Sequence, residues 1–221
     1  KISKLIKGGK KSFINEFELL KKIQEELSKE KNKLSFTDYS KEEIEYIKKL
    51  SLLSTKPIMY VANMDEDSIV AGNKYSEVVK NIGIKKNINV VFISAKIESE
   101  LISITEEQEK KELMKSLNIN NSGLEQFIIE GFKLLNLITF FTSGEKESRA
   151  WTIPKDMFAP QAARKIHTDF ERGFIAAEVI SYNNMVESGG ERKAKNNGKI
   201  RTEGKDYIVQ DGDVILFRFN V

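Results

Sequence analysis

The 221-residue sequence contains no cysteine and a single histidine. The absence of cysteine excludes a disulfide-stabilised secreted module and any site in which thiolates hold a metal ion. His167 has no second histidine with which to bind a metal, and no nearby group completes a catalytic triad with it. We therefore predict that His167 packs against the core or caps a helix.

Long apolar runs are also absent. No stretch approaches the ~18–20 apolar residues that a membrane-spanning helix needs, and the first residues, KISKLIKGGKK, lack the apolar core of a signal peptide. We expect a cytoplasmic protein with no membrane partner. The chain begins with Lys1 rather than Met, so we also expect a fragment of a longer protein.

The two signs of charge are nearly balanced, with 36 Lys+Arg and 33 Asp+Glu. The net charge of +3 is too small to indicate a nucleic-acid partner by itself. Its distribution is more informative, because 13 basic and 9 acidic side chains lie in residues 1–50, 10 and 12 in residues 51–135, and 13 and 12 in residues 136–221. We predict three segments with these boundaries.

Residues 1–50 have the pattern of two amphipathic helices. Between residues 13 and 30, apolar residues recur in steps of three and four, which places them on one helical face. They are Phe13, Phe17, Leu20, Ile23 and Leu27. A shorter pattern follows Ser40, a suitable N-cap. The resulting helical hairpin is either a scaffold arm or a surface that recruits an anionic partner through its surplus lysines.

Residues 51–135 have the order strand, helix, strand, helix, helix. The apolar runs at residues 57–62 and 88–94 are typical of strands buried on both faces of a parallel sheet. Residues 75–80 suit a crossover helix between the two strands. Thr105 and Ser122 each begin a capping-box pattern, which marks a helix start. This order predicts α/β architecture.

Each of these predicted strands ends in a polar loop, and the ligands of α/β sheets bind beyond the carboxyl ends of the strands. The loops contain Asn63, Met64 and Glu66 after the first strand, and Ser94, Ala95 and Lys96 after the second. They resemble the base-recognition loops of P-loop G proteins, Asn-Lys-x-Asp and Ser-Ala-Lys. An Asn amide can pair with the N6/N7 edge of a purine, a Met thioether can lie against the ring, and backbone N–H groups can donate to a ring acceptor. We predict a purine-nucleotide site, with ordinary strand-end turns as the alternative.

Glu66 departs from the G-protein pattern. An aspartate at this position pairs with N1–H and N2–H of guanine, whereas the longer glutamate would misplace its carboxylate. The sequence therefore predicts weak discrimination in favour of guanine, with ATP as the first ligand and GTP as the second.

Residues 136–221 predict an α+β domain with a mixed sheet and one helix. Strands at 137–141 and 149–153 flank a hairpin turn. A helix at 160–170, a strand at 176–180 and a last strand at 214–219 follow. Trp151 is predicted to lie in the core. The basic stretch 191–201 is predicted to be a polar loop, either solvated or in contact with RNA phosphates; its residues include Lys193, Lys195, Lys199 and Arg201.

Several stretches closely resemble the C-terminal part of the YchF / Obg-like ATPase family. They include Arg149-Ala150-Trp151-Thr152-Ile153-Pro154, Ala159-Pro160-Gln161-Ala162-Ala163 and Glu203-Gly204-Lys205-Asp206-Tyr207. The resemblance implies a ubiquitin-like β-grasp (TGS) domain at 136–221, the C-terminal half of a P-loop G domain at 51–135, and the end of a helical (coiled-coil) insertion at 1–50. It also implies that full-length relatives hydrolyse ATP with Mg²⁺ and associate with the ribosome or ribosomal RNA.

The phosphate-binding motifs of such enzymes are missing. No Gly-x-x-x-x-Gly-Lys-Ser/Thr and no Asp-x-x-Gly occurs in the sequence. The Gly8-Gly9-Lys10-Lys11 run lacks the required glycine spacing and the hydroxyl. We therefore expect this chain to have no catalytic residue and no Mg²⁺ ligand, and to be inactive as an ATPase by itself. A non-enzymatic TGS-type module that binds RNA or the ribosome is the alternative.

Overall fold

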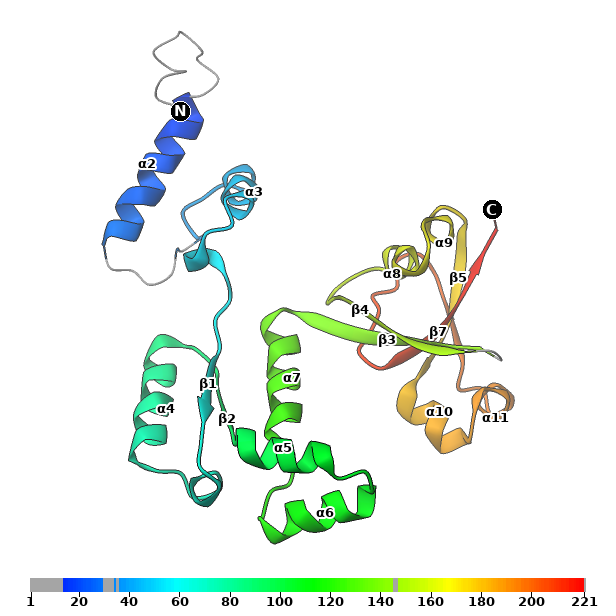
Figure 1. Ribbon diagram of the computed structural model, residues 1–221. Coiled ribbons are helices and arrows are strands. Elements are labelled where there is room, and N and C mark those ends of the chain that lie inside the picture. Colours follow the sequence, from blue (N-terminus) through cyan, green and yellow to red (C-terminus); the bar gives the residue numbers. More distant parts are fainter. Residues whose placement is uncertain (1–13, 30–33, 35, 145–146, 221) are drawn as a thin grey trace. The chain divides into compact units, whose positions relative to one another are not determined.

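The structure is a computed structural model that describes residues 14–29, 34, 36–144 and 147–220. The chain forms two compact units, residues 1–58 and residues 59–221, and Figure 1 labels their elements. Among the described residues, no helix is both long enough and apolar enough to cross a bilayer.

In its described residues, the first unit contains two α-helices. These are α2 (Ile14–Ser28) and α3 (Lys41–Lys49), followed by the short 3-10 helix η2 (Leu53–Thr55). Ser40 caps α3 as predicted, because its hydroxyl accepts a hydrogen bond from the Glu43 N–H while the Glu43 carboxylate accepts one from the Ser40 N–H. This reciprocal capping box satisfies two backbone donors at the start of the helix.

The core of the first unit lies where its two helices meet. Leu19 and Ile23 of α2 and Ile47 of α3 are buried there. The predicted helical hairpin is therefore confirmed. Phe13 and the glycine-lysine run at residues 8–11 lie outside the described residues.

The second unit begins with two parallel strands, β1 (Tyr60–Asn63) and β2 (Val90–Ile93). The crossover helix α4 (Lys74–Lys86) joins them as predicted, and Asn73 caps it by accepting hydrogen bonds from the N–H groups of its first turn. Because the strands are parallel neighbours, their carboxyl ends meet at one edge of the sheet. The loops that follow them are therefore brought together.

Four helical elements complete this region. They are η3 (Glu66–Ser68), α5 (Ala95–Ser103), α6 (Glu107–Ser116) and α7 (Gly123–Leu134). The capping box predicted at Ser122 is confirmed at the start of α7.

Two predictions for these helices are wrong. Sequence reasoning missed α5, because it interpreted Ser-Ala-Lys as a turn, whereas Ser94 is the N-cap of a helix that begins at Ala95. The capping box predicted at Thr105 does not form, since Glu106 is the N-cap of α6 and makes no side-chain capping bond. A four-residue pattern cannot by itself decide which residue becomes the N-cap of the helix.

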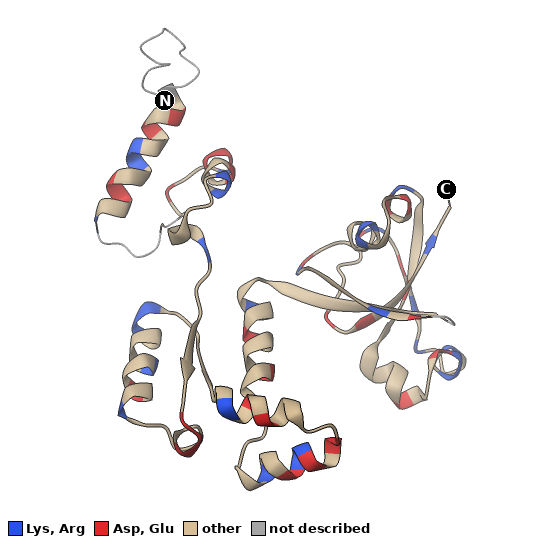
Figure 2. Ribbon diagram, in the orientation of Figure 1, with Lys and Arg blue, Asp and Glu red and all other residues tan. Residues whose placement is uncertain are grey.

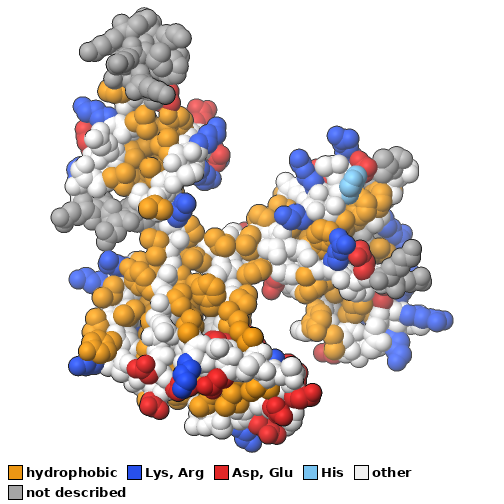
Figure 3. All heavy atoms as spheres, in the orientation of Figure 1, with side chains coloured by type: hydrophobic (Ala, Val, Ile, Leu, Met, Phe, Trp, Pro, Cys, Tyr) orange, Lys and Arg blue, Asp and Glu red, His pale blue; other side chains and the backbone are white. Residues whose placement is uncertain are grey.

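The prediction that both strands are buried on both faces is also wrong. Val61 in β1 is 43% exposed, and Ile82 on α4 and Ile129 on α7 are also exposed. Figure 3 shows hydrophobic side chains spread over the surface of this region. The reason is that β1 and β2 form a sheet of only two strands in the described residues, which is too narrow to be covered on both faces.

The C-terminal domain is built on a five-stranded sheet with the order β4-β3-β7-β5-β6. β3 and β7 are parallel and the other neighbours are antiparallel. The strands are β3 (Leu137–Ser143), β4 (Ser148–Pro154), β5 (Phe174–Ser181), β6 (Arg201–Glu203) and β7 (Asp213–Phe219). Sequence reasoning missed only the short β6.

The core of this domain lies between the sheet and a helix. Phe140 and Ile215 from the sheet and Ala162 from the helix are fully or almost fully buried. Trp151 is half-buried at the edge of this core, and its indole N–H donates to the Thr142 hydroxyl at 2.9 Å. The mixed sheet with a packed helix has the predicted α+β, β-grasp-like form.

The predicted helix at 160–170 is divided in two, α8 (Ala159–Ile166) and α9 (Thr168–Arg172). His167 lies between them in an extended conformation, and its Nδ1 accepts a hydrogen bond from the Asp169 N–H at 3.3 Å. The prediction that the only histidine caps a helix is therefore confirmed. The prediction of one continuous helix is wrong, because the extended backbone at His167 ends α8 and begins α9.

Two further short helices, α10 (Tyr182–Ser188) and α11 (Glu191–Asn196), were not predicted. The basic stretch 191–201 is therefore not a polar loop throughout. Ala194 of α11 is fully buried in a cluster with Ile180 and Val214, which anchors the otherwise polar helix. A lone apolar residue in a polar run gives no periodic signal, so the sequence does not reveal α11.

Candidate functional site

The two predicted ligand loops lie side by side at the carboxyl ends of β1 and β2. The strand register pairs Asn63 with Ile93, and the Met64 N–H donates to the Ile93 carbonyl at 2.7 Å beyond the last paired residues. Asn63 and Ser94, the first residue of each predicted loop, therefore leave the sheet at the same level.

Asn63 joins the loops directly. Its Oδ1 accepts a hydrogen bond from the Ala95 N–H at 3.0 Å. Ala95 is the first residue of α5, and its N–H is one of the donors that a helix leaves without an intrahelical partner. This bond uses one of the two lone pairs of Oδ1 and leaves the Nδ2 donor for a ligand. The predicted pairing of Asn63 with a purine edge stays a prediction.

Glu66 and Lys96 form a second link between the loops. The Lys96 Nζ lies 2.7 Å from the Glu66 Oε2, and this hydrogen bond to the carboxylate raises the pKa of Lys96. The lysine side chain is 69% exposed and the glutamate side chain 34% exposed. An ion pair this open to water adds little to stability, but it fixes which way the carboxylate faces. One oxygen of Glu66 is therefore engaged within the protein.

Met64 and Ser94, two further side chains of the predicted loops, are buried. Met64 is only 9% exposed, so little of its thioether is available to a ligand. Ser94 is 3% exposed, and its hydroxyl has no hydrogen-bond partner among the described residues. A buried polar group without a partner costs free energy, so the Ser94 hydroxyl is a group that a ligand could satisfy.

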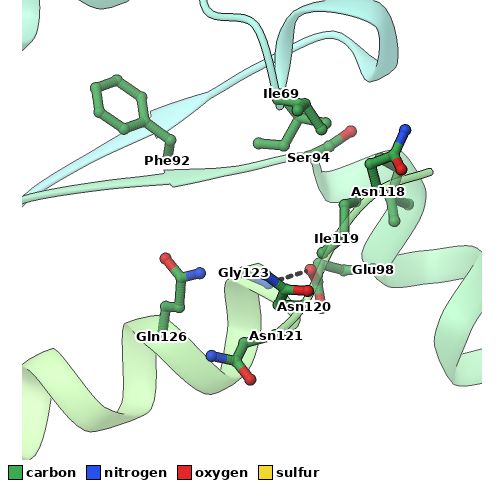
Figure 4. A pocket seen from close by; sticks show the side chains of 12 residues that line it. Ile69, Phe92, Ser94, Glu98, Asn118, Ile119, Asn120, Asn121, Gly123 and Gln126 are labelled. Atoms are coloured by element: carbon green, nitrogen blue, oxygen red, sulfur yellow. Dashed lines mark hydrogen bonds between the residues drawn. The ribbon is translucent and has the colours of Figure 1, made fainter. Parts of the chain in front are cut away.

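A cavity of about 380 Å³ adjoins Ser94 (Figure 4). Apart from Ser94, its polar lining consists of Glu98, Asn118, Asn120, Asn121 and Gln126. Glu98 accepts a hydrogen bond from the Gly123 N–H at 2.7 Å, the dashed line in the figure. Sequence reasoning missed these side chains, although the run Asn118-Ile119-Asn120-Asn121 was a usable signal. Carboxamides both donate and accept hydrogen bonds, so they can recognise a neutral polar ring.

The described residues contain no cluster of three or more His, Cys, Asp or Glu side chains that could hold a metal ion.

The predicted nucleic-acid contacts lie in the C-terminal domain, and the structure separates them. Lys193 and Lys195 are on α11, and Lys199 follows it with its Nζ 3.4 Å from the Asn184 Oδ1. Arg201 is on β6, where it pairs with Glu203 and donates to the Tyr207 hydroxyl. Its charge is therefore partly compensated, unlike those of the three lysines.

Comparisons with known proteins agree along the whole chain. Residues 137–220 match the family model described as YchF-GTPase_C, protein of unknown function (DUF933). The chain is 45% identical over 223 aligned residues to the protein named ribosome-binding ATPase YchF in Bacillus subtilis, and 46% identical over 221 to the protein of that name in Escherichia coli O157:H7. In both alignments all of this chain is covered. The chain belongs to the YchF family and matches its C-terminal part.

A solved structure supports the assignment. The structure of the Schizosaccharomyces pombe YchF GTPase superposes with a TM-score of 0.79 at 35% identity, over 94% of this chain and 55% of that one. This YchF-family chain spans 60% of the length of the two bacterial relatives.

Proposed function

We propose that this chain provides the base-recognition half of a purine-nucleotide site in a YchF-type ATPase. The observation that carries the proposal is the double link between the strand-end loops, Asn63 to Ala95 and Glu66 to Lys96. It positions the Asn63 Nδ2 as a donor toward purine N7, an acceptor that adenine and guanine share. The N–H of Lys96, in the first turn of α5, is a second donor.

The proposed site accepts adenine at least as well as guanine. Guanine selection requires a carboxylate that receives N1–H and N2–H together, and the bond to Lys96 engages one oxygen of Glu66. Ser94 and the cavity beside it complete the site on the protein side. ATP is thus the proposed ligand, with GTP as the second.

Hydrolysis is proposed for the whole protein and not for this chain alone. Phosphoryl transfer depends on groups that position the γ-phosphate and its Mg²⁺, and neither set is present here. We infer that the remaining part of a full-length protein packs on the exposed apolar side chains of β1, α4 and α7 and completes the G domain. On this view residues 1–50, 51–135 and 136–221 are the end of the helical insertion, half of the G domain and the TGS domain.

The base subsite can be tested without the phosphate cradle. Amide NMR spectra of the chain are recorded with AMP, GMP and CMP at millimolar concentration. We expect both purine nucleotides, and not CMP, to shift the resonances of Ala95, Lys96 and the Asn63 side chain. Equal shifts with all three nucleotides would show that only the shared phosphate and ribose bind, and shifts with none would leave the loops as ordinary strand-end turns.

We propose as a second function that the protein associates with the ribosome, in the cytoplasm, through its C-terminal domain. Two observations favour it: the relatives are named ribosome-binding, and Lys193, Lys195 and Lys199 form no ion pair within the described part of the chain. Unpaired cations attract RNA phosphates and release counterions, so affinity should fall as salt rises.

Charge reversal tests this second function. Changing Lys193, Lys195 and Lys199 to Glu should weaken co-sedimentation with ribosomes and flatten its salt dependence. Reversal of Lys85 and Lys86, at the end of α4, is the control and should change neither. If the triple variant co-sedimented like the parent at every salt concentration, the basic residues would be merely solvated.

A further inference from the structure

The C-terminal domain contains a second pocket, which the proposed nucleotide site does not use. It has a volume of about 360 Å³ and lies where β3 and β7 meet α10. Its wall is apolar, formed by Phe141, Met185, Val186 and Val214 together with Tyr182. The rings of Phe141 and Tyr182 lie 6.0 Å apart, tilted by 39°. Tyr182 and Val186 are 54% and 59% exposed, so an apolar surface with an aromatic ring is open to a ligand.

The rim of this pocket is basic. Gly189 and Gly190 line it and lead directly into α11, the basic helix beside α10 in Figure 2. A Cβ on Gly189 would lie 3.6 Å from the Lys193 Nζ, which places that ammonium group at the pocket wall. The Lys199 Nζ is held near the Asn184 Oδ1, next to the lining residue Met185.

The positive charge at the rim is not compensated. Between residues 182 and 201 the chain carries five basic and two acidic side chains. In the part of the chain that the structure describes, four of these five, Arg192, Lys193, Lys195 and Lys199, form no ion pair, and the fifth, Arg201, pairs with Glu203. An anionic partner is therefore favoured at this edge.

The backbone at the rim also allows close approach. Gly190 has φ +118° and ψ 169°, a conformation that side-chain-bearing residues rarely adopt, and a Cβ there would meet nothing within 4 Å. The strand of a ligand can thus lie against the Gly189-Gly190 backbone. Glycine at this point leaves the space between the aromatic pocket and the lysines free.

We propose that this pocket, bounded by Tyr182 and α11, binds an unstacked base of single-stranded RNA. The base stacks on the exposed face of Tyr182, and the flanking phosphates contact Lys193 and Lys195. Single-stranded nucleic acid is recognised in general by this combination of an aromatic platform and a basic groove. The inference rests on the proposed ribosome association and names the chemistry of its contact. An acidic peptide would meet the charge but has a ring to stack only where it carries an aromatic residue, whereas every nucleotide carries a base.

The first experiment distinguishes recognition of the base from recognition of the phosphates. Fluorescence anisotropy measures binding of the 221-residue chain to labelled oligoribonucleotides of about ten nucleotides, and to an abasic ribose-phosphate strand of equal length. We expect the base-bearing strands to bind roughly tenfold more tightly than the abasic strand, since stacking contributes ~1–3 kcal/mol per base. Tyr182→Leu should make the two affinities equal, whereas Tyr182→Phe, which keeps the ring, should retain the roughly tenfold difference.

A second pair of variants tests the rim. Lys193→Gln combined with Lys195→Gln should weaken the binding of base-bearing and abasic strands by the same factor and leave the ratio of the two affinities unchanged. Lys85→Gln with Lys86→Gln is the matched control and should have no effect. Val186→Gln, at a lining position that is 59% exposed, should lower the ratio even if Tyr182→Leu were unstable.

The outcomes are distinguishable. Equal affinity for base-bearing and abasic strands would overturn the inference and leave ribosome association standing. Loss of ribosome co-sedimentation in Tyr182→Leu, with both strands bound as by the parent, would assign the pocket to a ribosomal protein and also overturn it. If no strand bound at low salt and the lysine variants sedimented with ribosomes unchanged, both this inference and the ribosome proposal would fail.

Discussion

The Asn63 side-chain oxygen and the Ala95 backbone N–H are hydrogen-bonded at 3.0 Å, although the two residues are 32 positions apart. One bond thus ties the end of β1 to the start of α5. In the proposed site this bond divides the asparagine into two functions, because Oδ1 holds the loops together and Nδ2 is the donor proposed to face a ligand. The two functions can be separated by substitution.

Asn63→Asp should keep the tether and lose the ligand contact, because a carboxylate still accepts from Ala95 but has no N–H to donate. Asn63→Ala should lose both. A net hydrogen bond contributes about 1 kcal/mol, so hydrogen exchange at the Ala95 amide should accelerate roughly fivefold in Asn63→Ala and little in Asn63→Asp. Neither variant should show purine-dependent NMR shifts. Unchanged exchange in Asn63→Ala would mean that the tether contributes nothing.

Base preference should depend on Lys96. In a chimaera that joins this chain to the first part of the Bacillus subtilis relative, ATP should bind at least as tightly as GTP. Lys96→Met should free the Glu66 carboxylate and lower the ATP-to-GTP affinity ratio. Lys133→Met is the control, because Lys133 pairs with Glu130 at the same 2.7 Å far from the loops. Calorimetry showing GTP bound tenfold more tightly by the parent chimaera, about 1.4 kcal/mol, would contradict the adenine preference.

The chain alone should not hydrolyse ATP. Most of the rate enhancement in phosphoryl transfer comes from the phosphate cradle and its Mg²⁺, and no phosphate-binding motif occurs in the sequence. Phosphate release from the purified chain should equal the buffer background with and without Mg²⁺. Release above that background, co-eluting with the chain, would show that a different site carries the reaction.

Residues 136–221 should fold by themselves, because their core lies within their own sheet and helices. Phe140 is completely buried at the centre of that core, so Phe140→Ala should lower the free energy of unfolding by about 3–5 kcal/mol. Leu216→Ala on β7, where the side chain is 49% exposed, is the control and should cost far less. Urea unfolding followed by Trp151 fluorescence measures both. An isolated domain without a cooperative transition would refute the boundary.

The C-terminal domain should lose stability at alkaline pH through Tyr207. Burial, and then the hydrogen bond that its hydroxyl donates to Asp213 at 2.7 Å, raise the pKa of Tyr207 to about 12. Because folding favours the protonated phenol, its contribution is complete below pH 10 and is lost as the pH rises toward 12. Tyr207→Phe should flatten the decline of the melting temperature above pH 10. The exposed Tyr182, changed to Phe, should leave that decline as in the parent.

The sequence was sufficient to predict features that depend on a few neighbouring residues. The N-cap at Ser40, the capping box at Ser122 and the two strands of the hairpin that contains Trp151 were predicted correctly, since each depends on neighbouring side chains and backbone. The two strand-end loops were recognised for the same reason, because an apolar run followed by polar residues is a local pattern. The family resemblance extended this reading to the whole C-terminal domain.

Tertiary structure alone decided what those residues do. Asn63 meets Ala95, and Glu66 meets Lys96, only because β1 and β2 are parallel neighbours in one register; no spacing along the chain specifies that the asparagine oxygen is used within the protein. Helix α11 exists because Ala194 is buried against β5 and β7, a contact with residues distant in sequence. Hydrogen bonds and burial between segments are set by the packing of the whole domain, so a one-dimensional pattern cannot contain them.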